Sequence, residues 1–165
     1  MSAGGFRMAD VSGKPVTRRR ALASGKIVVG REAFQHLEQG TLTKGDALKL
    51  AEIAGLQAAK QTPSLIPLCH PISLNRVSVR TVLHAHEQAV EVLCLAEIAE
   101  RTGVEMEALT GASVALLTIW DLVKPINPAL EITATQLLYK SGGKSGEWTN
   151  PAGLHPEARK LLDEH

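Results

Sequence analysis

Residues 72–84, ISLNRVSVRTVLH, and residues 89–99, AVEVLCLAEIA, decide the fold of this chain. Both stretches are rich in β-branched and apolar residues, which predicts two long strands. The short polar link AHEQ, residues 85–88, joins them. We therefore expect a β-hairpin, and with it a mainly antiparallel sheet.

A long helix is expected on the N-terminal side of this hairpin. Thr43 can cap the helix, and Asp46 stands at the capping-box position. The helix is predicted to run to about Gln61, because Pro63 should stop it. One face carries only small residues and suits close approach to another helix or to a sheet: Ala47, Ala51, Ala54, Gly55, Ala58 and Ala59.

A second long helix is expected on the C-terminal side, from Glu105 to Lys124, where Pro125 ends it. A short strand at 26–29, a short helix at 31–39 and a strand at 130–139 complete the pattern. Long helices on one face of a mainly antiparallel sheet constitute an α+β fold.

Length and composition indicate one domain. The chain has 165 residues, which fits a single core. We expect residues 1–24 to form an extended basic arm, residues 25–148 to form the domain, and residues 149–165 to form a loosely attached tail. A short helical pattern at 156–162 lies inside that tail.

Charge and cysteine content exclude several classes of protein. The net charge is +1 and aromatic residues are 3% of the chain, which disfavours nucleic-acid binding. The two cysteines, Cys69 and Cys94, cannot form a disulfide framework or a four-ligand zinc site, and no other metal-ligand spacing appears. The longest apolar stretch, 112–123, is too short to span a membrane. We expect a cytoplasmic protein that binds no membrane.

The helix 105–124 carries a mostly polar stripe made of Glu107, Thr110, Gly111, Val114, Thr118 and Asp121. This stripe is either a solvent-facing edge or part of a site. Glu107 and Asp121 are about 21 Å apart along the helix and cannot both touch one small reacting centre. Three explanations stay open: a long ligand, two separate sites, or a second subunit that brings the far end close.

Two further segments have functional and ordinary interpretations. Lys44 lies near a helix N-terminus, where an anion is favoured, or it is an ordinary first-turn lysine. The loop 140–146, KSGGKSG, is not a P-loop, because that pattern requires glycine where Leu138 stands. Its amides and two lysines could bind phosphates, or the loop is a solvated linker.

His70 lies between Cys69 and Pro71, in a sequence that is costly to bury without partners. It is either an acid–base or hydrogen-bonding group of a site, or a structural histidine. His84 and His86 are expected on the surface.

LIPLCHP (residues 65–71) and TGVEMEALT (residues 102–110), in this order, are specific motifs. With them the chain resembles the cyclic pyranopterin monophosphate synthase family of molybdenum cofactor biosynthesis. The resemblance covers roughly residues 8–148. Further matching segments are 10–12, 44–46, 53–60, 117–121, Lys124 and 140–146.

The resemblance implies a lyase that converts a cyclised dihydro-GTP, 3′,8-cyclo-7,8-dihydroguanosine triphosphate, to cyclic pyranopterin monophosphate and diphosphate. A radical-SAM GTP cyclase would supply this substrate. The resemblance also implies a ferredoxin-like fold, a homohexamer built as a trimer of dimers with sites between subunits, and neither metal nor organic cofactor.

The resemblance also implies site residues. Asp121 and Lys124 match the Asp-x-x-Lys motif of the family, and Lys44 matches its lysine before Gly-Asp; these three are the predicted catalytic residues. The predicted substrate-binding residues are Leu68, Cys69, His70, Met106, Glu107, Glu105, Arg19, Lys140 and Lys144.

Three residues depart from the family pattern: Arg20 replaces a usual Glu, Val123 a usual Cys, and Pro125 a common Ala. Pro125 leaves open how Lys124 is aimed. A second class of function also remains open, because ferredoxin-like domains often bind small effectors without chemistry, so the same pocket could belong to a sensor.

Overall fold

The computed structural model describes residues 5–164. Within these residues one sheet has five strands in the order β2-β3-β1-β4-β5, and every pairing is antiparallel. The strands are β1 (Thr17–Val28), β2 (Arg76–His84), β3 (Ala89–Glu100), β4 (Glu131–Ser141) and β5 (Trp148–Thr149). The helices are α1 (Arg31–Gln39), α2 (Ala47–Leu65), α3 (Glu105–Val123) and α4 (Pro156–Asp163), with a short 3₁₀ turn at Ala85–Glu87.

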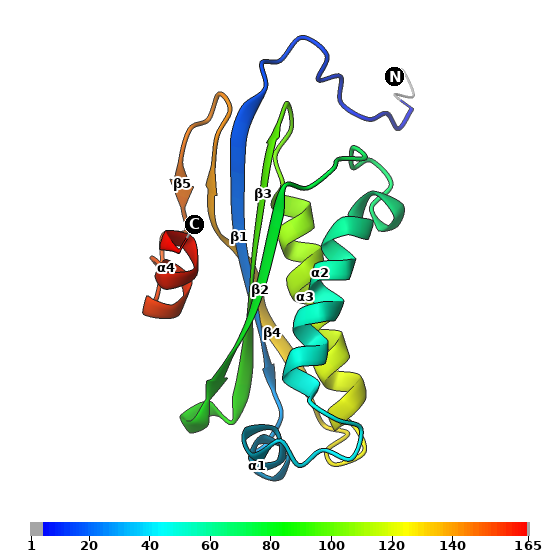
Figure 1. Cartoon of the computed structure of the whole chain (residues 1–165), viewed down its shortest axis with the longest axis vertical. Coiled ribbons are helices and arrows are strands. Elements are labelled where there is room, and N and C mark those ends of the chain that lie inside the picture. Colours follow the sequence, from blue (N-terminus) through cyan, green and yellow to red (C-terminus); the bar gives the residue numbers. More distant parts are fainter. Residues whose placement is uncertain (1–4, 165) are drawn as a thin grey trace.

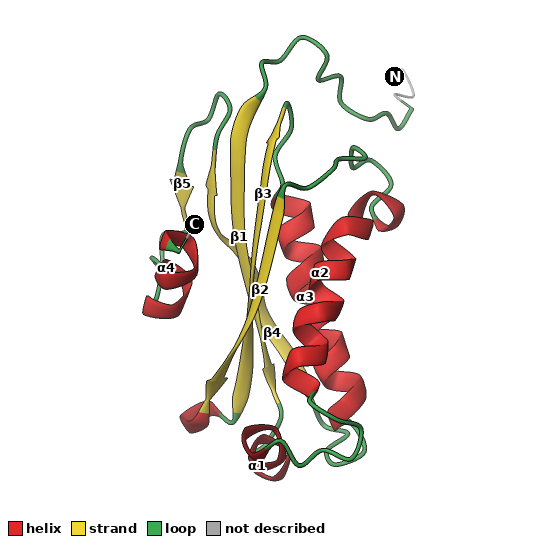
Figure 2. Cartoon of the chain, in the orientation of Figure 1, coloured by secondary structure: helices red, strands yellow, loops and turns green. Residues whose placement is uncertain are grey.

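The two long helices lie side by side on one face of the sheet, while α4 lies on the other face (Figures 1 and 2). Without α1, β5 and α4, the chain order is β-α-β-β-α-β, and the first four strands stand in the order β2-β3-β1-β4. This is a ferredoxin-like α+β fold, as the resemblance implied. The expectation of long helices on one face is confirmed.

The hairpin formed by β2 and β3 is also confirmed. Its turn is the 3₁₀ segment Ala85–Glu87, and Gln88 follows with a φ of 50°. β3 is buried almost throughout, because α2 and α3 cover one face of the sheet and α4 covers the other. β2 begins only at Arg76, not at residue 72. The Asn75 side chain accepts a hydrogen bond from Ala99 N at 2.8 Å, which holds the chain beside β3 before pairing begins.

Two other strand predictions were too short. β1 starts at Thr17 instead of residue 26, so the predicted arm 1–24 loses its last eight residues to the sheet. The Arg18–Arg20 run looked like a solvated arm, yet Glu97 on β3 forms ion pairs with both Arg18 and Arg20. β4 likewise extends to Ser141, two residues beyond the predicted end. The helix predicted at 31–39 is confirmed as α1.

Both ends of α2 differ from the prediction. Asp46, not Thr43, is the N-cap, and its Oδ1 accepts from Leu48 N and Lys49 N, both at 3.1 Å. The helix also continues through Pro63 to Leu65. Pro63 has no N–H to give to the carbonyl of Ala59, but the Thr62 hydroxyl donates to that carbonyl at 3.0 Å. The substitute hydrogen bond explains why proline does not stop this helix.

Small residues bring α2 and α3 into close contact. A Cβ added to Gly55 would lie 2.9 Å from Gly111 O, and one added to Gly111 would lie 2.6 Å from Cys94 Sγ. The predicted small-residue face of α2 is therefore a helix-packing face, although Ala54 is only half-buried. Gly111 belongs to the polar stripe predicted on α3, so the middle of that stripe packs against α2 and is not a solvent-facing edge.

By length and composition alone, α3 is long and apolar enough to span a membrane. The prediction that the chain has no stretch long enough is wrong on that measure. The packing gives α3 another role, because buried residues such as Ala112, Leu116 and Ile119 contact the sheet and α2. Such a pattern is typical of a core helix.

α4 closes a second, smaller core on the opposite face of the sheet. Its Ala158, Leu161 and Leu162 pack with Leu22, Leu93, Leu95, Leu138 and Tyr139. Burial of a leucine side chain contributes about 2 kcal/mol. The short helix predicted at 156–162 is confirmed, but the expectation of a loosely attached tail is wrong for α4.

Candidate active site

The structure divides the predicted site residues between the two ends of α3. The N-terminal end brings together the nine residues predicted to bind substrate. The C-terminal end carries the three predicted catalytic residues, Lys44, Asp121 and Lys124. The fourteen residues from Glu107 to Asp121 rise about 21 Å along the helix. One chain therefore does not place all twelve residues around one reacting centre.

A cavity of about 240 Å³ lies at the N-terminal end of α3. His70 Nε2 donates to the carbonyl of Ala9 at 2.7 Å, which leaves Nδ1 as the acceptor of the neutral ring. Leu68 and Met106 are exposed there and offer apolar surface. The predicted substrate-binding residues on its wall are Leu68, Cys69, His70, Glu105, Met106 and Glu107.

Glu107 is buried with only 3% of its surface exposed. Burial raises the pKa of its carboxyl, the charge of Glu105 raises it further, and a hydrogen bond from its own backbone N–H opposes both. Burial also raises the pKa of the Cys69 thiol, with a further contribution from the charge of Glu107. Cys69 is therefore a thiol at neutral pH and is not built as a nucleophile.

Glu105 joins α3 to β4, because Lys140 Nζ lies 3.1 Å from its Oε1. Arg19, Glu105 and Lys140 border a small cavity of about 50 Å³. Because Glu105 lines the larger cavity as well, its carboxylate stands between the His70 region and the cationic groups described next.

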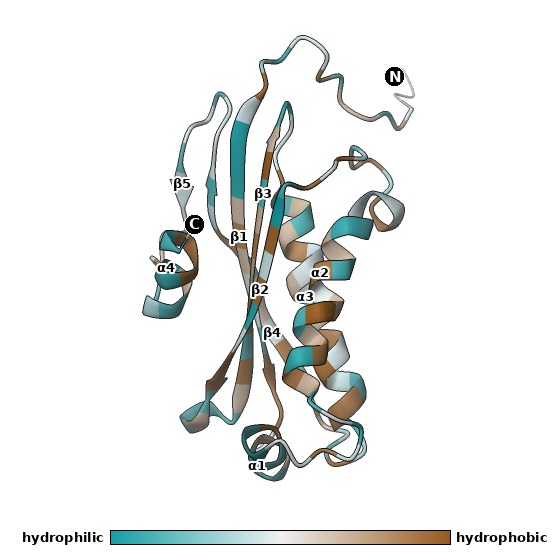
Figure 3. Cartoon of the chain, in the orientation of Figure 1, coloured by the Kyte–Doolittle hydropathy of each residue, from teal (hydrophilic) through white to brown (hydrophobic). Residues whose placement is uncertain are grey.

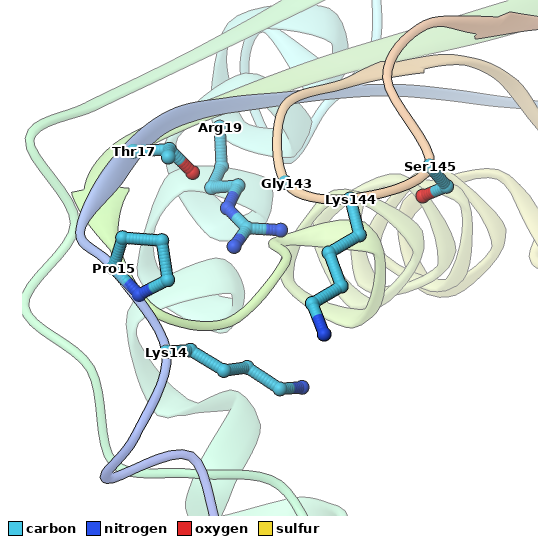
Figure 4. Close-up of a pocket in the computed structure, with 7 residues that line it drawn as sticks. All are labelled: Lys14, Pro15, Thr17, Arg19, Gly143, Lys144 and Ser145. Atoms are coloured by element: carbon cyan, nitrogen blue, oxygen red, sulfur yellow. The ribbon is translucent and has the colours of Figure 1, made fainter.

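Those cationic groups surround a cavity of about 400 Å³, lined by Lys14, Pro15, Thr17, Arg19, Gly143, Lys144 and Ser145. Among the described residues, none that lines it is acidic. Lys14, Arg19 and Lys144 extend into the same space from the arm, β1 and the glycine loop (Figure 4). We call this the cationic cavity.

Two polar atoms of the cationic cavity have no hydrogen-bond partner among residues 5–164. They are Arg19 Nε and Thr17 Oγ1, and both are buried. An unpaired buried donor is costly, so such atoms are usually satisfied by a ligand or water. Three cations and a free donor suit the oxygens of a phosphate chain.

The glycine loop approaches β1 closely. A Cβ added to Gly142 would overlap the carbonyl of Arg18, and the φ of Gly142 is +101°. Only glycine therefore lets the loop run beside β1 and carry Lys144 to the cavity. The alternative of a solvated linker does not account for this contact.

Lys14 and Thr17 were not among the predicted site residues. Both lie within the segment that was expected to be an arm. The basic character of that segment is visible in the sequence. Only the tertiary structure shows that Lys14, among its basic residues, lines the cavity together with Arg19.

At the other end of α3, Lys124 Nζ donates to Asp121 Oδ1 at 2.7 Å. The hydrogen bond from Lys124, followed by the charges of Lys124 and Lys44, holds the pKa of Asp121 below its ordinary value of 3.8. Both members of the pair are exposed, at 53% for Lys124 and 60% for Asp121. α3 ends at Val123, one residue before the predicted end at Lys124, and Lys124 forms its C-cap.

Lys44 does not lie in the first turn of α2. It precedes the N-cap Asp46, whose own carboxylate binds the free N–H groups of the helix. Leu48 N and Lys49 N, which an anion at that terminus would contact, therefore already have an acceptor. Lys44 instead lowers the pKa of Asp121 through its charge, so it lies with the other two predicted catalytic residues.

A third group lies on the opposite face of the sheet, beneath α4. The buried Glu91 accepts from His84 Nε2 at 2.8 Å and from His155 Nε2 at 2.9 Å. His155 Nδ1 also accepts from Ala158 N, so its Nε2 carries the proton and is not free to bind a metal. His84 is thus half-buried, not fully on the surface. Among residues 5–164, no group of three His, Cys, Asp or Glu side chains could hold a metal ion.

Comparison with known proteins gives one consistent result. The model of the MoaC family matches residues 8–143. A protein named cyclic pyranopterin monophosphate synthase from Nocardioides sp. is 49% identical over 149 residues, which is 90% of this chain and 91% of the relative.

Proteins of the same name give similar values. The one from Streptomyces avermitilis is 49% identical over 89% of this chain and 85% of its own length. The one from Clostridium botulinum is 48% identical over 87% and 90%. With a ferredoxin-like fold and the residues described above, the chain belongs to the MoaC family.

Proposed function

We propose that this protein is a cyclic pyranopterin monophosphate synthase, a lyase of molybdenum cofactor biosynthesis. It converts 3′,8-cyclo-7,8-dihydroguanosine triphosphate to cyclic pyranopterin monophosphate and releases diphosphate. The observation that carries this proposal is the cationic cavity, where Lys14, Arg19 and Lys144 line one space and, among residues 5–164, no acidic residue joins them. A substrate that carries a triphosphate needs such a site.

The rest of the N-terminal end suits the purine-derived ring. Leu68 and Met106 offer apolar surface for its faces. Burial raises the pKa of Glu107, which makes its carboxyl a candidate proton donor or acceptor beside the ring. His70 provides a hydrogen-bonding nitrogen, and Glu105 holds Lys140 toward the phosphates.

The catalytic work is assigned to Asp121, Lys124 and Lys44. The reaction opens a ring, forms a new carbon–nitrogen ring, and closes a cyclic phosphate. In that closure a hydroxyl oxygen attacks the α-phosphorus, its proton passes to a base, and the bond to diphosphate breaks. Asp121 orients Lys124 and exchanges protons with it, while Lys44 stabilises negative charge.

Because these two groups lie at opposite ends of α3, we propose that the protein is a homo-oligomer with sites shared between subunits. The C-terminal end of α3 in one copy completes the N-terminal end in another. Exposed apolar side chains on the helices, Leu50, Ile53 and Leu117, favour contact between copies. The family resemblance makes a hexamer, built as a trimer of dimers, the proposed assembly.

The proposal also assigns the setting of the reaction. A radical-SAM GTP cyclase supplies the substrate, the reaction takes place in the cytoplasm, and the protein needs neither metal nor organic cofactor. No nucleic acid or membrane takes part.

Turnover tests the proposal directly. Purified protein is incubated with 3′,8-cyclo-7,8-dihydroguanosine triphosphate, and diphosphate and the pterin product are measured. Release of both supports an enzyme. Binding of the substrate without release of diphosphate would support the sensor instead.

A further inference from the structure

Arg18 and Arg20 flank Arg19 on β1 and reach the opposite face of the sheet. Side chains alternate along a strand. Ala21 and Ala23, which share the face of Arg19, belong to the core under α2 and α3, whereas Leu22 belongs to the core under α4. The first part of β1 therefore carries hydrophilic side chains on both faces of the sheet, and Figure 3 colours this part of the strand mostly teal.

Glu97 on β3 binds both flanking arginines. Arg18 Nη2 lies 3.0 Å from Glu97 Oε2, and Arg20 Nε lies 2.9 Å from Glu97 Oε1. Only 8% of the Glu97 side chain is exposed. Burial alone would raise the pKa of Glu97, but the two arginines lower it overall. Glu97 is thus a charged, buried carboxylate that holds both neighbours of Arg19.

Arg20 has a second partner, because its Nη2 donates to the carbonyl of Leu162 at 2.6 Å. Leu162 lies near the end of α4 and is itself buried. One arginine therefore joins β1, β3 and α4. This helix lies outside residues 8–143, which the family model matches.

The contact lies where the two strands that carry the cationic cavity separate. Arg20 is paired with Ser141, the last residue of β4, and the glycine loop leaves the sheet immediately afterwards. Beyond this point Thr17, Arg18 and Arg19 pair with β3 alone. Arg19 and Arg20 both border the small cavity beside Glu105 and Lys140.

We propose that Arg20 and Glu97 are positioning residues for the cationic cavity, and that α4 supports the cavity by binding Arg20 through the carbonyl of Leu162. This inference rests on the proposed role of the cavity in binding phosphates. Loss of the Arg20 contacts frees the end of β1 and the glycine loop. Arg19 and Lys144 then lose their fixed spacing, while Asp121 and Lys124 are untouched. Substrate binding weakens and the chemical step does not.

The test compares Arg20→Met and Glu97→Gln with Glu164→Gln. The control removes a carboxylate that binds Arg80 on β2 at 2.5 Å, so it also alters a contact of the α4 region but leaves the contacts of Arg20 with Glu97 and Leu162 in place. Binding of inorganic triphosphate is measured by titration calorimetry, and KM and kcat are measured separately. We expect Kd and KM to rise about 5–10-fold in the first two variants, with kcat within about twofold and the control unchanged.

A conservative variant covers the case in which Arg20→Met fails to fold. Arg20→Lys keeps the charge beside Glu97, and we expect it to restore most of the triphosphate affinity. Unchanged affinity and KM in Arg20→Met, or in Glu97→Gln if Arg20→Met is unfolded, would overturn the inference. So would equal losses in Glu164→Gln.

One further variant separates this inference from the proposed function. Arg19→Ala should abolish triphosphate binding. If Arg19→Ala binds triphosphate normally, the phosphate site itself is wrong. If Arg19→Ala loses binding while Arg20→Met keeps it, only the positioning role is wrong.

Discussion

The guanidinium of Arg19 occupies the space that a side chain on Gly143 would need, because a Cβ added to Gly143 would overlap Arg19 Nη1. The φ of Gly143 is +71°, which glycine adopts readily and other residues rarely adopt. The loop and the arginine are therefore fitted to each other. The cationic cavity depends on a residue that has no side chain.

Gly143→Ala should displace Arg19 and weaken substrate binding by about tenfold or more. The overlapping atom is the flexible end of a side chain, so the protein should still fold, with a loss of about 1 kcal/mol for the positive φ. KM and thermal unfolding check both points. Gly146→Ala is the matched control, because Gly146 has a φ of +65° but nothing within 4 Å of its added Cβ. Equal KM values for the two variants would contradict the role given to Arg19.

Lys124→Ala and Asp121→Ala should each lower kcat by about 10²-fold or more, because each removes a group that moves protons. Both side chains are exposed, so the free energy of unfolding should change by less than about 1 kcal/mol. Steady-state kinetics and urea unfolding measure the two effects. Lys49→Ala breaks a similar i,i+3 ion pair with Asp46 on α2 and should keep full activity. Near-normal kcat in Asp121→Ala would remove the assignment.

Mixed oligomers test the shared site. His70→Ala alters one end of α3 and Lys124→Ala the other, so each variant alone should be inactive. If subunits share sites, refolding the two together in equal amounts should restore about one quarter of the activity, since one site in four combines two intact ends.

The control for this experiment is a mixture of Lys44→Ala and Asp121→Ala. The charge of Lys44 acts on Asp121 at the same end of α3, so this mixture should stay inactive. If the mixture of His70→Ala and Lys124→Ala is as inactive as this control, the proposal of shared sites is contradicted.

Glu107 should make stability fall as pH rises. Its pKa is raised by burial, so between its ordinary value of 4.5 and the raised value the folded state binds more protons than the unfolded state. The contribution of Glu107 to the free energy of unfolding is then greatest below pH 4.5 and is lost as the pH rises through that window. Glu107→Gln removes this contribution, so its free energy of unfolding relative to the unsubstituted protein should increase as pH rises. Urea titrations from pH 4 to pH 7 measure it, and parallel curves would contradict the burial argument.

The two cysteines should react at different rates. Burial raises the pKa of Cys94 to about 12, so it should not react with iodoacetamide until the protein unfolds. Cys69 is only partly buried but also has a raised pKa, so it should react more slowly than a free thiol. Glu107→Gln removes a negative charge beside Cys69 and should speed its alkylation, as measured by mass spectrometry. An unchanged rate would show that Glu107 does not act on the thiol.

The sequence predicted the elements whose local pattern agrees with their surroundings. The β2–β3 hairpin, α1 and α3 have the expected type and nearly the expected ends. The errors lie where a distant partner overrides a local signal. Thr62 donates a hydrogen bond to the carbonyl that Pro63 leaves without a donor. Glu97 forms ion pairs with Arg18 and Arg20, so the basic segment that was expected to be an arm begins β1.

The candidate site also has residues that the local sequence could predict and residues that depend on distant contacts. Residue types made His70, Glu107, Asp121 and Lys124 candidates from the chain alone, and the family resemblance added the predicted catalytic role of Asp121 and Lys124. The separation of Glu107 from Asp121 also followed from the sequence, because helix rise per residue is constant. Lys14 and Thr17 could not be predicted to line the cationic cavity, because nothing in the local sequence distinguishes them from the other residues of a polar arm.

The sequence by itself therefore determined the fold class, the family and the chemistry of the side chains, because these depend on local pattern and residue type. Only the tertiary structure decided that Lys14, Arg19 and Lys144 share one cavity and that α4 reaches Arg20. Those contacts join residues far apart in the chain, and their geometry depends on how the sheet and loops pack. No local pattern encodes such distances.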